Sequence, residues 1–373
     1  MLQKALGLAV IPVFVLGCGS SAARDRPGPS DAGLDHDTHD ASASDHEADD
    51  GSADNSLGPA ASDELDDGVD NCQGSWEWTP GPALNVARRG ARAVGLDASL
   101  LVMGGVTANG PTASVERLDD GAKAWKEVSA MPAPNAYFAA AATNGFVYVA
   151  GGYASGLQEV VAATLRYDVG NDSWEQLPNM PTARANAAAV FWNGRLIVAG
   201  GRTSVTPTLE ITGAIEAYDP ATGVWTTIAP GMPTPREGCS GIVEDGRLLL
   251  AGGSTSEVET SYGMDLVEYF SSEDLSWHAG APLSVPRVSA AAGNPSGCAI
   301  VAGGWMQYGG GAQFTSAEAL GDKAWLALPD LPTSRWDPAG AVMKGAFYAI
   351  GGAQYETPPD FPISSSVDIL RRK

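Results

Sequence analysis

The sequence predicts an all-β protein built from six copies of one structural unit, and three observations support this prediction. The 373 residues include 46 glycines and 25 prolines, and no long stretch has the apolar period of a helix. Pairs of adjacent glycines recur 47 to 52 residues apart, and an arginine or asparagine stands 16 residues before each pair. Repetition at such a period is typical of folds in which each unit buries its apolar faces against its neighbours.

Each glycine pair follows a short apolar run that we expect to be a β-strand. The pairs begin at Gly104, Gly151, Gly200, Gly252, Gly303 and Gly351. The residues 16 positions earlier are Arg88, Asn135, Arg184, Arg236, Arg287 and Arg335. This interval leaves room for one strand, a hairpin and the next strand. Asn144-Gly145, Asn193-Gly194 and Asp245-Gly246 fall at the expected hairpins, and these dipeptides accept the positive φ of tight turns.

Aromatic residues mark two further strands in each unit. Tyrosines predict a third strand, and tryptophans predict a fourth. The tyrosines are Tyr167, Tyr218 and Tyr269, and the tryptophans are Trp125, Trp174, Trp225, Trp277 and Trp325. Leu118, Leu320 and Leu370 stand where a tyrosine is expected. Arginine, apolar strand, diglycine, tyrosine and tryptophan, repeated in this order over residues 76–373, resemble the Kelch repeat. The resemblance implies a six-bladed β-propeller with one four-stranded blade per repeat.

The two ends of the repeat region complement each other. The last unit ends at Lys373 without a fourth strand, whereas Trp76 to Pro80 has the character of that strand and no unit of its own. We therefore expect the N-terminal strand to complete the last blade and close the ring, which leaves no blade face uncovered.

The N-terminal segment resembles a bacterial lipoprotein signal. Met1 to Lys4 is cationic, Ala5 to Leu16 is apolar but too short to span a bilayer, and Leu16-Gly17-Cys18 resembles a lipobox. The resemblance implies a signal peptide over 1–17 and lipid attachment at Cys18; ordinary cleavage near Ala22 is the alternative. Gly19 after the cysteine favours the outer membrane. We thus expect an exported protein of the bacterial cell envelope, held on the membrane by its lipid.

Residues 18–71 are interpreted as a disordered acidic linker between the lipid and the propeller of residues 72–373. Between Asp31 and Asp70 there are fourteen Asp or Glu residues and no Lys, Arg or aromatic residue, so the segment cannot bury enough apolar surface to fold. His36, His39 and His46 lie among its carboxylates; a solvated spacer is favoured over capture of cations, and no metal site is assigned. Cys72, Cys239 and Cys298 remain. Their odd number leaves a thiol unpaired, their spacing matches no disulfide framework or zinc site, and their pairing stays open.

Two groups of residues are candidates for binding a ligand at the mouth of the propeller. The loops before the first strand and after the diglycine open on one face, so the resemblance places five arginines there, namely Arg88, Arg184, Arg236, Arg287 and Arg335. The alternative is that each arginine donates to carbonyls of the adjoining blade. The second group, from the fifth and sixth units, is Trp305, Tyr308, Trp336 and Tyr355. Such aromatic residues are typical of interfaces and sugar platforms, although they could instead fill the channel.

The candidate residues favour a binding protein over an enzyme. The ligand would be a polypeptide or a glycan, bound by a monomer without a cofactor. Some exported Kelch propellers are similar to sialic-acid mutarotases, which need a carboxylate beside arginines, and Glu257, Glu259 or Glu356 could supply it. A copper radical oxidase is excluded because His278 is the only histidine outside the linker. No nucleophile triad, phosphate loop or basic nucleic-acid patch is present.

Overall fold

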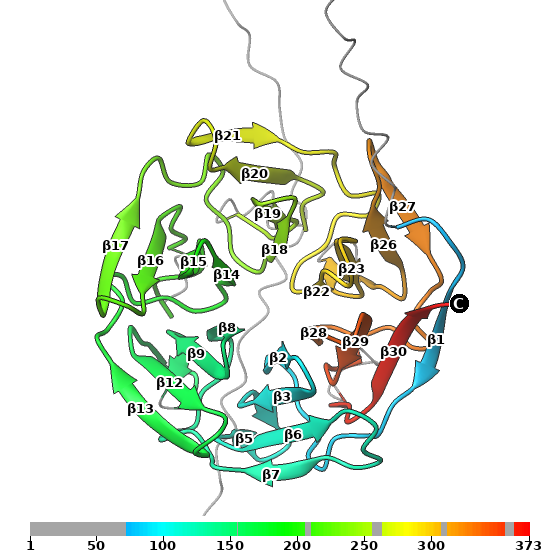
Figure 1. Ribbon diagram of the computed structural model, residues 1–373, viewed down its shortest axis with the longest axis horizontal. Helices are drawn as coiled ribbons and strands as arrows, with labels where there is room; N and C mark the ends of the chain where they lie inside the picture. Colours follow the sequence, from blue (N-terminus) through cyan, green and yellow to red (C-terminus); the bar gives the residue numbers. More distant parts are fainter. Residues whose placement is uncertain (1–71, 155, 206–209, 256–262, 307–311, 355–361) are drawn as a thin grey trace, which may run out of the picture. The chain divides into compact units, whose positions relative to one another are not determined.

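The computed structural model describes residues 72–154, 156–205, 210–255, 263–306, 312–354 and 362–373. Every regular element in these ranges is a β-strand, and six four-stranded sheets are arranged around a central axis (Figure 1). Within the same ranges no helix is long and apolar enough to cross a membrane. The predicted all-β, six-bladed propeller is therefore confirmed.

Each blade is a meander whose innermost strand comes first in the chain. Blade 1 contains β2 (Arg92–Leu96), β3 (Ser99–Met103), β6 (Val115–Asp119) and β7 (Lys126–Val128). Blade 2 contains β8 (Ala139–Thr143), β9 (Phe146–Ala150), β12 (Thr164–Asp168) and β13 (Ser173–Leu177). Blade 3 contains β14 (Ala188–Trp192), β15 (Arg195–Ala199), β16 (Ile215–Asp219) and β17 (Val224–Ile228). Blade 4 contains β18 (Ser240–Glu244), β19 (Arg247–Ala251), β20 (Val267–Ser271) and β21 (Ser276–Ala279). Blade 5 contains β22 (Ala291–Gly293), β23 (Ile300–Ala302), β26 (Ala317–Leu320) and β27 (Trp325–Leu328). Blade 6 contains β28 (Ala339–Met343), β29 (Ala346–Ile350), β30 (Val367–Arg372) and β1 (Trp76–Pro80).

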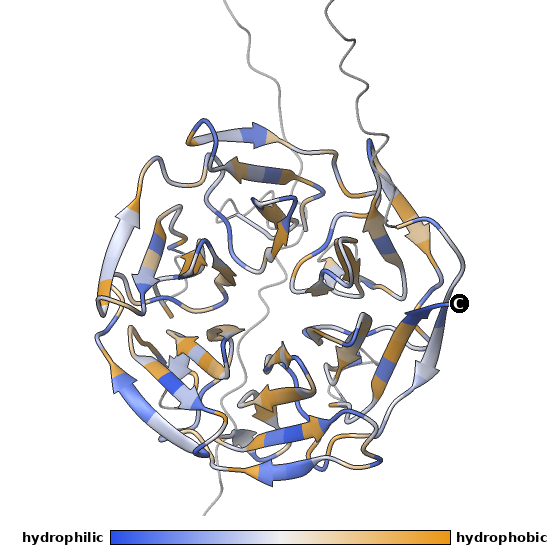
Figure 2. Cartoon of the chain, in the orientation of Figure 1, coloured by the Kyte–Doolittle hydropathy of each residue, from blue (hydrophilic) through white to orange (hydrophobic). Residues whose placement is uncertain are grey.

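The innermost strands approach one another so closely that only small residues fit between them. The residue five positions after each repeat arginine or Asn135 is alanine or glycine, namely Ala93, Ala140, Ala189, Gly241, Ala292 and Gly340. A Cβ on Gly340 would lie 2.3 Å from the backbone nitrogen of Ala292. Apolar side chains dominate the inner strands, whereas outer strands such as β7 and β13 are polar (Figure 2). The core therefore lies between neighbouring blades.

The predicted hairpins and the positions of the strand tyrosines and tryptophans are confirmed. Asn193 and Gly194 have φ of 49° and 75°, as a tight hairpin turn between β14 and β15 requires. The Nε1 of each of the five predicted tryptophans donates to a carbonyl that follows the outer strand of the preceding blade, as Trp225 does to Pro178 at 2.9 Å. Trp174 and Trp225 pair with Tyr167 and Tyr218 across the strands. In blade 4, however, Trp277 pairs with Phe270. Tyr269 lies in the third strand, as predicted, one residue before Phe270, and its ring contacts Arg247 and His278.

The N-terminal strand closes the ring, as predicted. β1 pairs with β30 from Trp76–Arg372 to Pro80–Asp368, and Trp78 Nε1 donates to the Pro329 carbonyl at 2.7 Å (Figure 1). A disulfide between Cys72 and Cys298 also joins the start of the domain to blade 5. The sequence left this pairing open because the two cysteines are 226 residues apart. Cys239 is a free, buried thiol.

Candidate functional site

The five repeat arginines are buried inside the blades, so their assignment to a ligand surface is wrong. Each is at most 2% exposed. Arg287 Nη1 donates to the carbonyls of Gly303 and Ser316 at 2.8 and 3.0 Å, and Nη2 pairs with Glu318 at 2.7 Å. The same pairing recurs as Arg88–Glu116, Arg184–Glu216, Arg236–Glu268 and Arg335–Asp368. Four of these arginines donate to the first-glycine carbonyl of their own blade, and Arg236 donates instead to the Leu250 carbonyl of its blade, so most of their donors are satisfied in the protein interior.

Blade 2 lacks both members of this ion pair. Asn135 takes the place of the arginine, and Leu165, opposite Val149, takes the place of the acid. Asn135 Nδ2 still donates to the Gly151 carbonyl at 2.8 Å. The two changes occur together because a buried carboxylate without its arginine would be costly.

Main-chain hydrogen bonds link every blade to the next around the mouth. The second glycine of each pair donates to the carbonyl of the arginine or asparagine in the following blade. For example, Gly304 donates to Arg335 at 3.0 Å, and Gly352 donates to Arg88 at 2.9 Å. Gly352 has φ of 94° and Gly304 has φ of 88°, which only glycine adopts readily. The diglycines thus explain both the repeat signature and the closed edge of the mouth.

The next positions in the chain include five partly exposed side chains that can face a ligand, namely Arg89, Tyr153, Arg202, Trp305 and Trp336. The residue after each arginine or Asn135 forms an antiparallel bridge with the residue after the diglycine. The six pairs are Arg89–Val106, Ala136–Tyr153, Ala185–Arg202, Glu237–Ser254, Val288–Trp305 and Trp336–Ala353. Unlike the arginines beneath them, these residues differ from blade to blade. This layer therefore gives the mouth its chemical character.

An aromatic and basic cluster occupies the mouth over blades 5, 6 and 1. The predicted pair of tryptophans is brought together: the rings of Trp305 and Trp336 are half-buried, with centroids 5.9 Å apart. The Arg89 guanidinium lies 4.7 Å from the centre of the Trp336 ring. Arg89 also donates to the Tyr137 hydroxyl, which in turn donates to Asp337 at 2.7 Å. Burial, together with the neighbouring Asp337 carboxylate, raises the pKa of Tyr137 well above its ordinary value. Tyr137 therefore stays a neutral donor.

A second polar cluster lies over blades 2 to 4. Arg202 pairs with Glu237 through two hydrogen bonds, of which Nε to Oε2 is 3.1 Å. Glu237 is only 5% exposed. Tyr153 lies beside this ion pair and packs edge-on against Tyr137, at 6.0 Å between centroids. Tyr153 thus connects the two clusters across the mouth.

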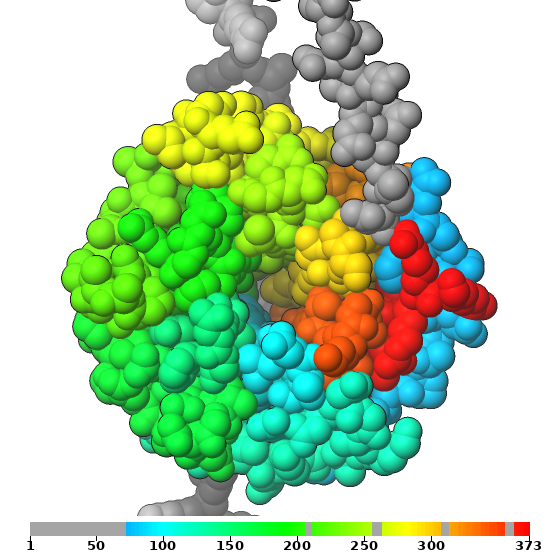
Figure 3. Space-filling model, in the orientation of Figure 1, coloured from blue at the N-terminus to red at the C-terminus, as the bar shows by residue number. Residues whose placement is uncertain are grey.

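The mouth leads into a central channel with a cavity of about 150 Å³. The centre of the disc is visibly hollowed in the space-filling view (Figure 3). Arg92, Asn186, Ser289 and Asp337 line the cavity. Burial lowers the pKa of Arg92, and the Asp337 carboxylate opposes this shift. Asn186 Oδ1 is buried with no hydrogen-bond partner among the described residues. The channel thus contains polar groups that a ligand or water could satisfy.

Other predicted residues cannot be placed at the mouth. Tyr308, Tyr355 and the acids Glu257, Glu259 and Glu356 lie outside the described residues. His278 lies in β21, stacked on Tyr269 at 5.0 Å and bonded to Asp274 at 2.8 Å. Sequence reasoning missed Arg89, Tyr137, Arg202, Glu237 and Asp337. Their signal was available: they stand one or two positions after the repeat arginine or Asn135, or directly after a diglycine.

Known proteins support the repeat and the fold. The Kelch motif matches residues 87–132, 134–181 and 183–232, so Kelch repeats are detected in the first three blades. Kelch repeat and BTB domain-containing protein 1 of Ectromelia virus (strain Moscow) is 26% identical over 136 residues, 36% of this chain and 23% of that protein. This chain therefore matches less than a quarter of that relative's length. The solved structure of YjhT has a TM-score of 0.66 and 18% identity, covering 77% of this chain and 95% of that one.

Proposed function

We propose that this protein is a binding module of the bacterial cell envelope that recognises a polypeptide or a glycan at the propeller mouth. The observation that carries this proposal is the cluster of Trp305, Trp336, Arg89, Tyr137 and Asp337, which converge from blades 5, 6, 1 and 2. The repeat packing does not require these residues, because the corresponding positions in other blades hold residues as different as alanine, serine, valine, Arg202 and Glu237.

The chemistry of the cluster suits recognition. Two rigid indole rings offer apolar area at little cost in side-chain entropy, and half-buried arginines offer directional donors. Among the described residues, Arg92, deeper in the channel, donates one N–H to the Ala91 carbonyl at 3.2 Å, so further N–H groups can donate to a ligand. Kelch propellers generally bind proteins, which supports a polypeptide as one of the two ligand classes.

The envelope part of the proposal rests on the N-terminal sequence. The short apolar segment before Cys18 and its lipobox-like residues support export and lipid attachment, with residues 19–71 as an acidic spacer. The Cys72–Cys298 disulfide adds support, because disulfides persist in oxidising compartments outside the cytoplasm.

A sialic-acid mutarotase-like activity is the second candidate. It is favoured by one observation: the buried carboxylates Asp337 and Glu237 lie at the mouth beside Arg89 and Arg202. Such pairs could exchange protons with a sugar hydroxyl. The rate at which NMR signals of the two sialic-acid anomers equilibrate, with and without the protein, distinguishes this activity from simple binding.

The binding proposal is tested first by probing glycan and peptide arrays with the protein. For a ligand so found, we expect Trp305→Ala and Arg89→Ala each to weaken binding by roughly 1 to 3 kcal/mol in calorimetry. Arg195→Ala is the matched control, since this half-exposed arginine lies at a hairpin on the opposite face. Trp192, which by sequence alone also seemed a suitable control, is 7% exposed and belongs to the core between blades 3 and 4. Equal losses for Arg195→Ala and Arg89→Ala would show that the mouth is not the binding face.

A further inference from the structure

The N-terminal segment is joined covalently to blade 5 by the disulfide between Cys72 and Cys298. Cys298 lies at the face opposite the mouth, and the chain that follows it leads to the mouth. Cys298 stands two residues before β23, and the chain continues from β23 through Gly303 and Gly304 to Trp305 in β24 (Trp305–Met306). β1 begins at the face opposite the mouth, because it is antiparallel to β30 and starts at the Arg372 end of that strand. An anchor before Cys72 and a ligand at Trp305 would thus pull on the two ends of the segment from Cys298 to Trp305.

Without the disulfide, tension on the N-terminus would act directly on β1. The first pair of the ladder, Trp76–Arg372, is the one nearest the pulled end. The contacts at this end include the Lys373 N–H to the Ser75 carbonyl at 2.9 Å, an exposed ion pair between Lys373 and Glu77, and an Arg372 side chain that donates to the Gln73 carbonyl and lies 5.4 Å from the centre of the Trp76 ring. Noncovalent contacts alone would then resist the tension.

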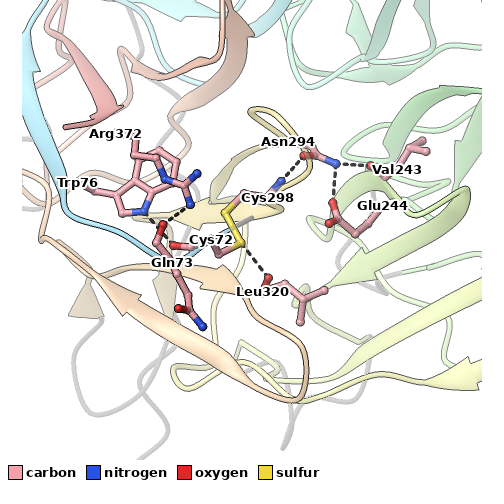
Figure 4. The surroundings of a disulfide bond; sticks show 9 residues. All are labelled: Cys72, Gln73, Trp76, Val243, Glu244, Asn294, Cys298, Leu320 and Arg372. Atoms are coloured by element: carbon pink, nitrogen blue, oxygen red, sulfur yellow. Dashed lines mark hydrogen bonds between the residues drawn. A yellow bond between two sulfur atoms is a disulfide. The ribbon is translucent and has the colours of Figure 1, made fainter. Parts of the chain in front are cut away.

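The disulfide is embedded so that tension would pass to two blades. Cys72 and Cys298 are 4% and 0% exposed. The Cys298 N–H donates to Asn294 Oδ1 at 2.6 Å, and Asn294 Nδ2 donates to the Val243 carbonyl and to Glu244 in blade 4, at 2.7 and 2.5 Å (Figure 4). The attachment point is therefore held by blade 4 as well as by blade 5.

We propose that the Cys72–Cys298 disulfide is a tension clamp, which carries force from the N-terminal segment directly to blade 5 and the mouth and keeps it off β1. The premises that a ligand binds at the mouth and that the N-terminus is anchored rest on the proposed function. The expectation that the disulfide bears tension in place of β1 does not depend on them. Closure of the ring by β1 can then be as short as five residues, because the strand has only to cover blade 6 and need not withstand pulling.

Single-molecule force measurement tests the clamp. The full chain carries Cys18→Ser so that no lipid is attached, with one handle at the N-terminus and the other inserted in the exposed Asn193-Gly194 turn. We expect the oxidised protein to show no early release before the propeller unfolds. Reduced protein, and separately the Cys72→Ser/Cys298→Ser variant, should release residues 72–80 at lower force, an extension of about 3 nm at full stretch.

Cys239→Ser is the control for loss of a thiol and should behave as the oxidised protein does. An early release of the same length and force in the oxidised protein would overturn the proposal, and so would its absence from both the reduced protein and the double variant. Reduction after folding keeps the test valid if the double variant does not fold. The force measurement depends neither on anchoring nor on ligand binding. Its result can therefore contradict the tension clamp without contradicting the proposed function, and the reverse.

Discussion

At the residue scale, the buried ion pairs of blade 1 and blades 3 to 6 show how a repeat places charge in a buried interior. In four of these blades the arginine donates to the carbonyl of the first glycine of the pair, and in all five the acid balances the arginine's charge. A lone buried charge would be strongly destabilising, whereas an apolar pair of similar volume need not be. Blade 2 shows the second solution within the same molecule, with Asn135 and Leu165 in the two places.

Replacing only the arginine of one blade should therefore lower the free energy of unfolding more than replacing the arginine and its acid together. We expect Arg287→Gln to lower the free energy of unfolding by about 3 to 5 kcal/mol, because Glu318 stays buried without its partner. The blade 2 combination, Arg287→Asn with Glu318→Leu, should come within about 2 kcal/mol of the wild type. Urea unfolding measures both. A double variant as unstable as the single one would mean that the pair itself, and not the isolated charge, determines the stability.

Glu244 is a second buried charge and predicts a pH dependence. Burial, and then the nearby Asp245, raises the pKa of Glu244 to about 7 from an ordinary value of 4.5. The folded state therefore holds this proton more tightly than the unfolded state. The resulting stabilisation is full below about pH 4.5 and is lost as the pH rises through 7.

The variant Glu244→Gln should remove this dependence, since an amide does not ionise. Relative to the wild type, it should gain about 2 kcal/mol in the free energy of unfolding between pH 5 and pH 8. The exposed Glu127→Gln is the matched control. Denaturant unfolding at the two pH values gives the comparison, and a pH-independent difference between Glu244→Gln and the wild type would contradict the assignment.

The arginines also show where sequence reasoning reached its limit at this scale. Their fixed offset from the diglycines located the mouth, but an offset does not reveal whether a side chain points outward or into its own blade. The acid two positions before Leu118, Tyr218, Leu320 and Leu370 was the missing clue, since it predicts an internal partner. Trp305 and Trp336 were recognised because they break the repeat, whereas Arg89 and Asp337 were overlooked beside them.

At the scale of elements, the outer strand of each blade is fixed by one tryptophan that reaches the previous blade. Apolar runs, turn dipeptides and the recurring tyrosines and tryptophans were enough to predict the strands, because the repeat shows each signal several times. These signals do not give the register of a strand: Tyr269 and Phe270 are adjacent aromatics in β20, and only the strand pairing shows that Phe270 meets Trp277. The disulfide could not be foreseen, because three cysteines allow three pairings and contact depends on the closed ring.

Removal of residues 72–80 should therefore destabilise blade 6 far more than the loss of so short a segment would suggest. It eliminates five β1–β30 pairs, the Trp78 contact with blade 5 and the disulfide together. Trp78→Ala alone separates the contact from the strand and should lower stability by about 2 to 4 kcal/mol, less than a fully buried tryptophan would. Thermal melts compare the two variants with the full chain; a truncated protein that melts as the full chain does would contradict closure by β1.

At the scale of the whole molecule, the ring divides structural and recognition roles between its layers. The layer of arginines and diglycines repeats around the mouth, while the layer above it varies from blade to blade. This separation lets the mouth change its chemistry without disturbing the bonds between blades. The disulfide and β1 lie at the opposite face and the rim, so closure and recognition share no residue.

Anchoring through the N-terminus would make use of the fact that β1 begins at the face opposite the mouth. If Cys18 carries lipid, the chain leaves the membrane through the acidic segment and enters the propeller at the face away from the mouth, so that the mouth is free to meet a ligand. Cys18→Ser should then abolish acylation and shift the protein from the detergent phase to the aqueous phase, because the acyl chains supply roughly 0.8 kcal/mol for each buried CH₂. Phase partitioning of cells that express each form measures this, with Cys239→Ser as the control that keeps Cys18. Equal partitioning of Cys18→Ser and the wild type into detergent would show that the N-terminal segment is not a lipid anchor, and the protein would then need another means of staying at the envelope.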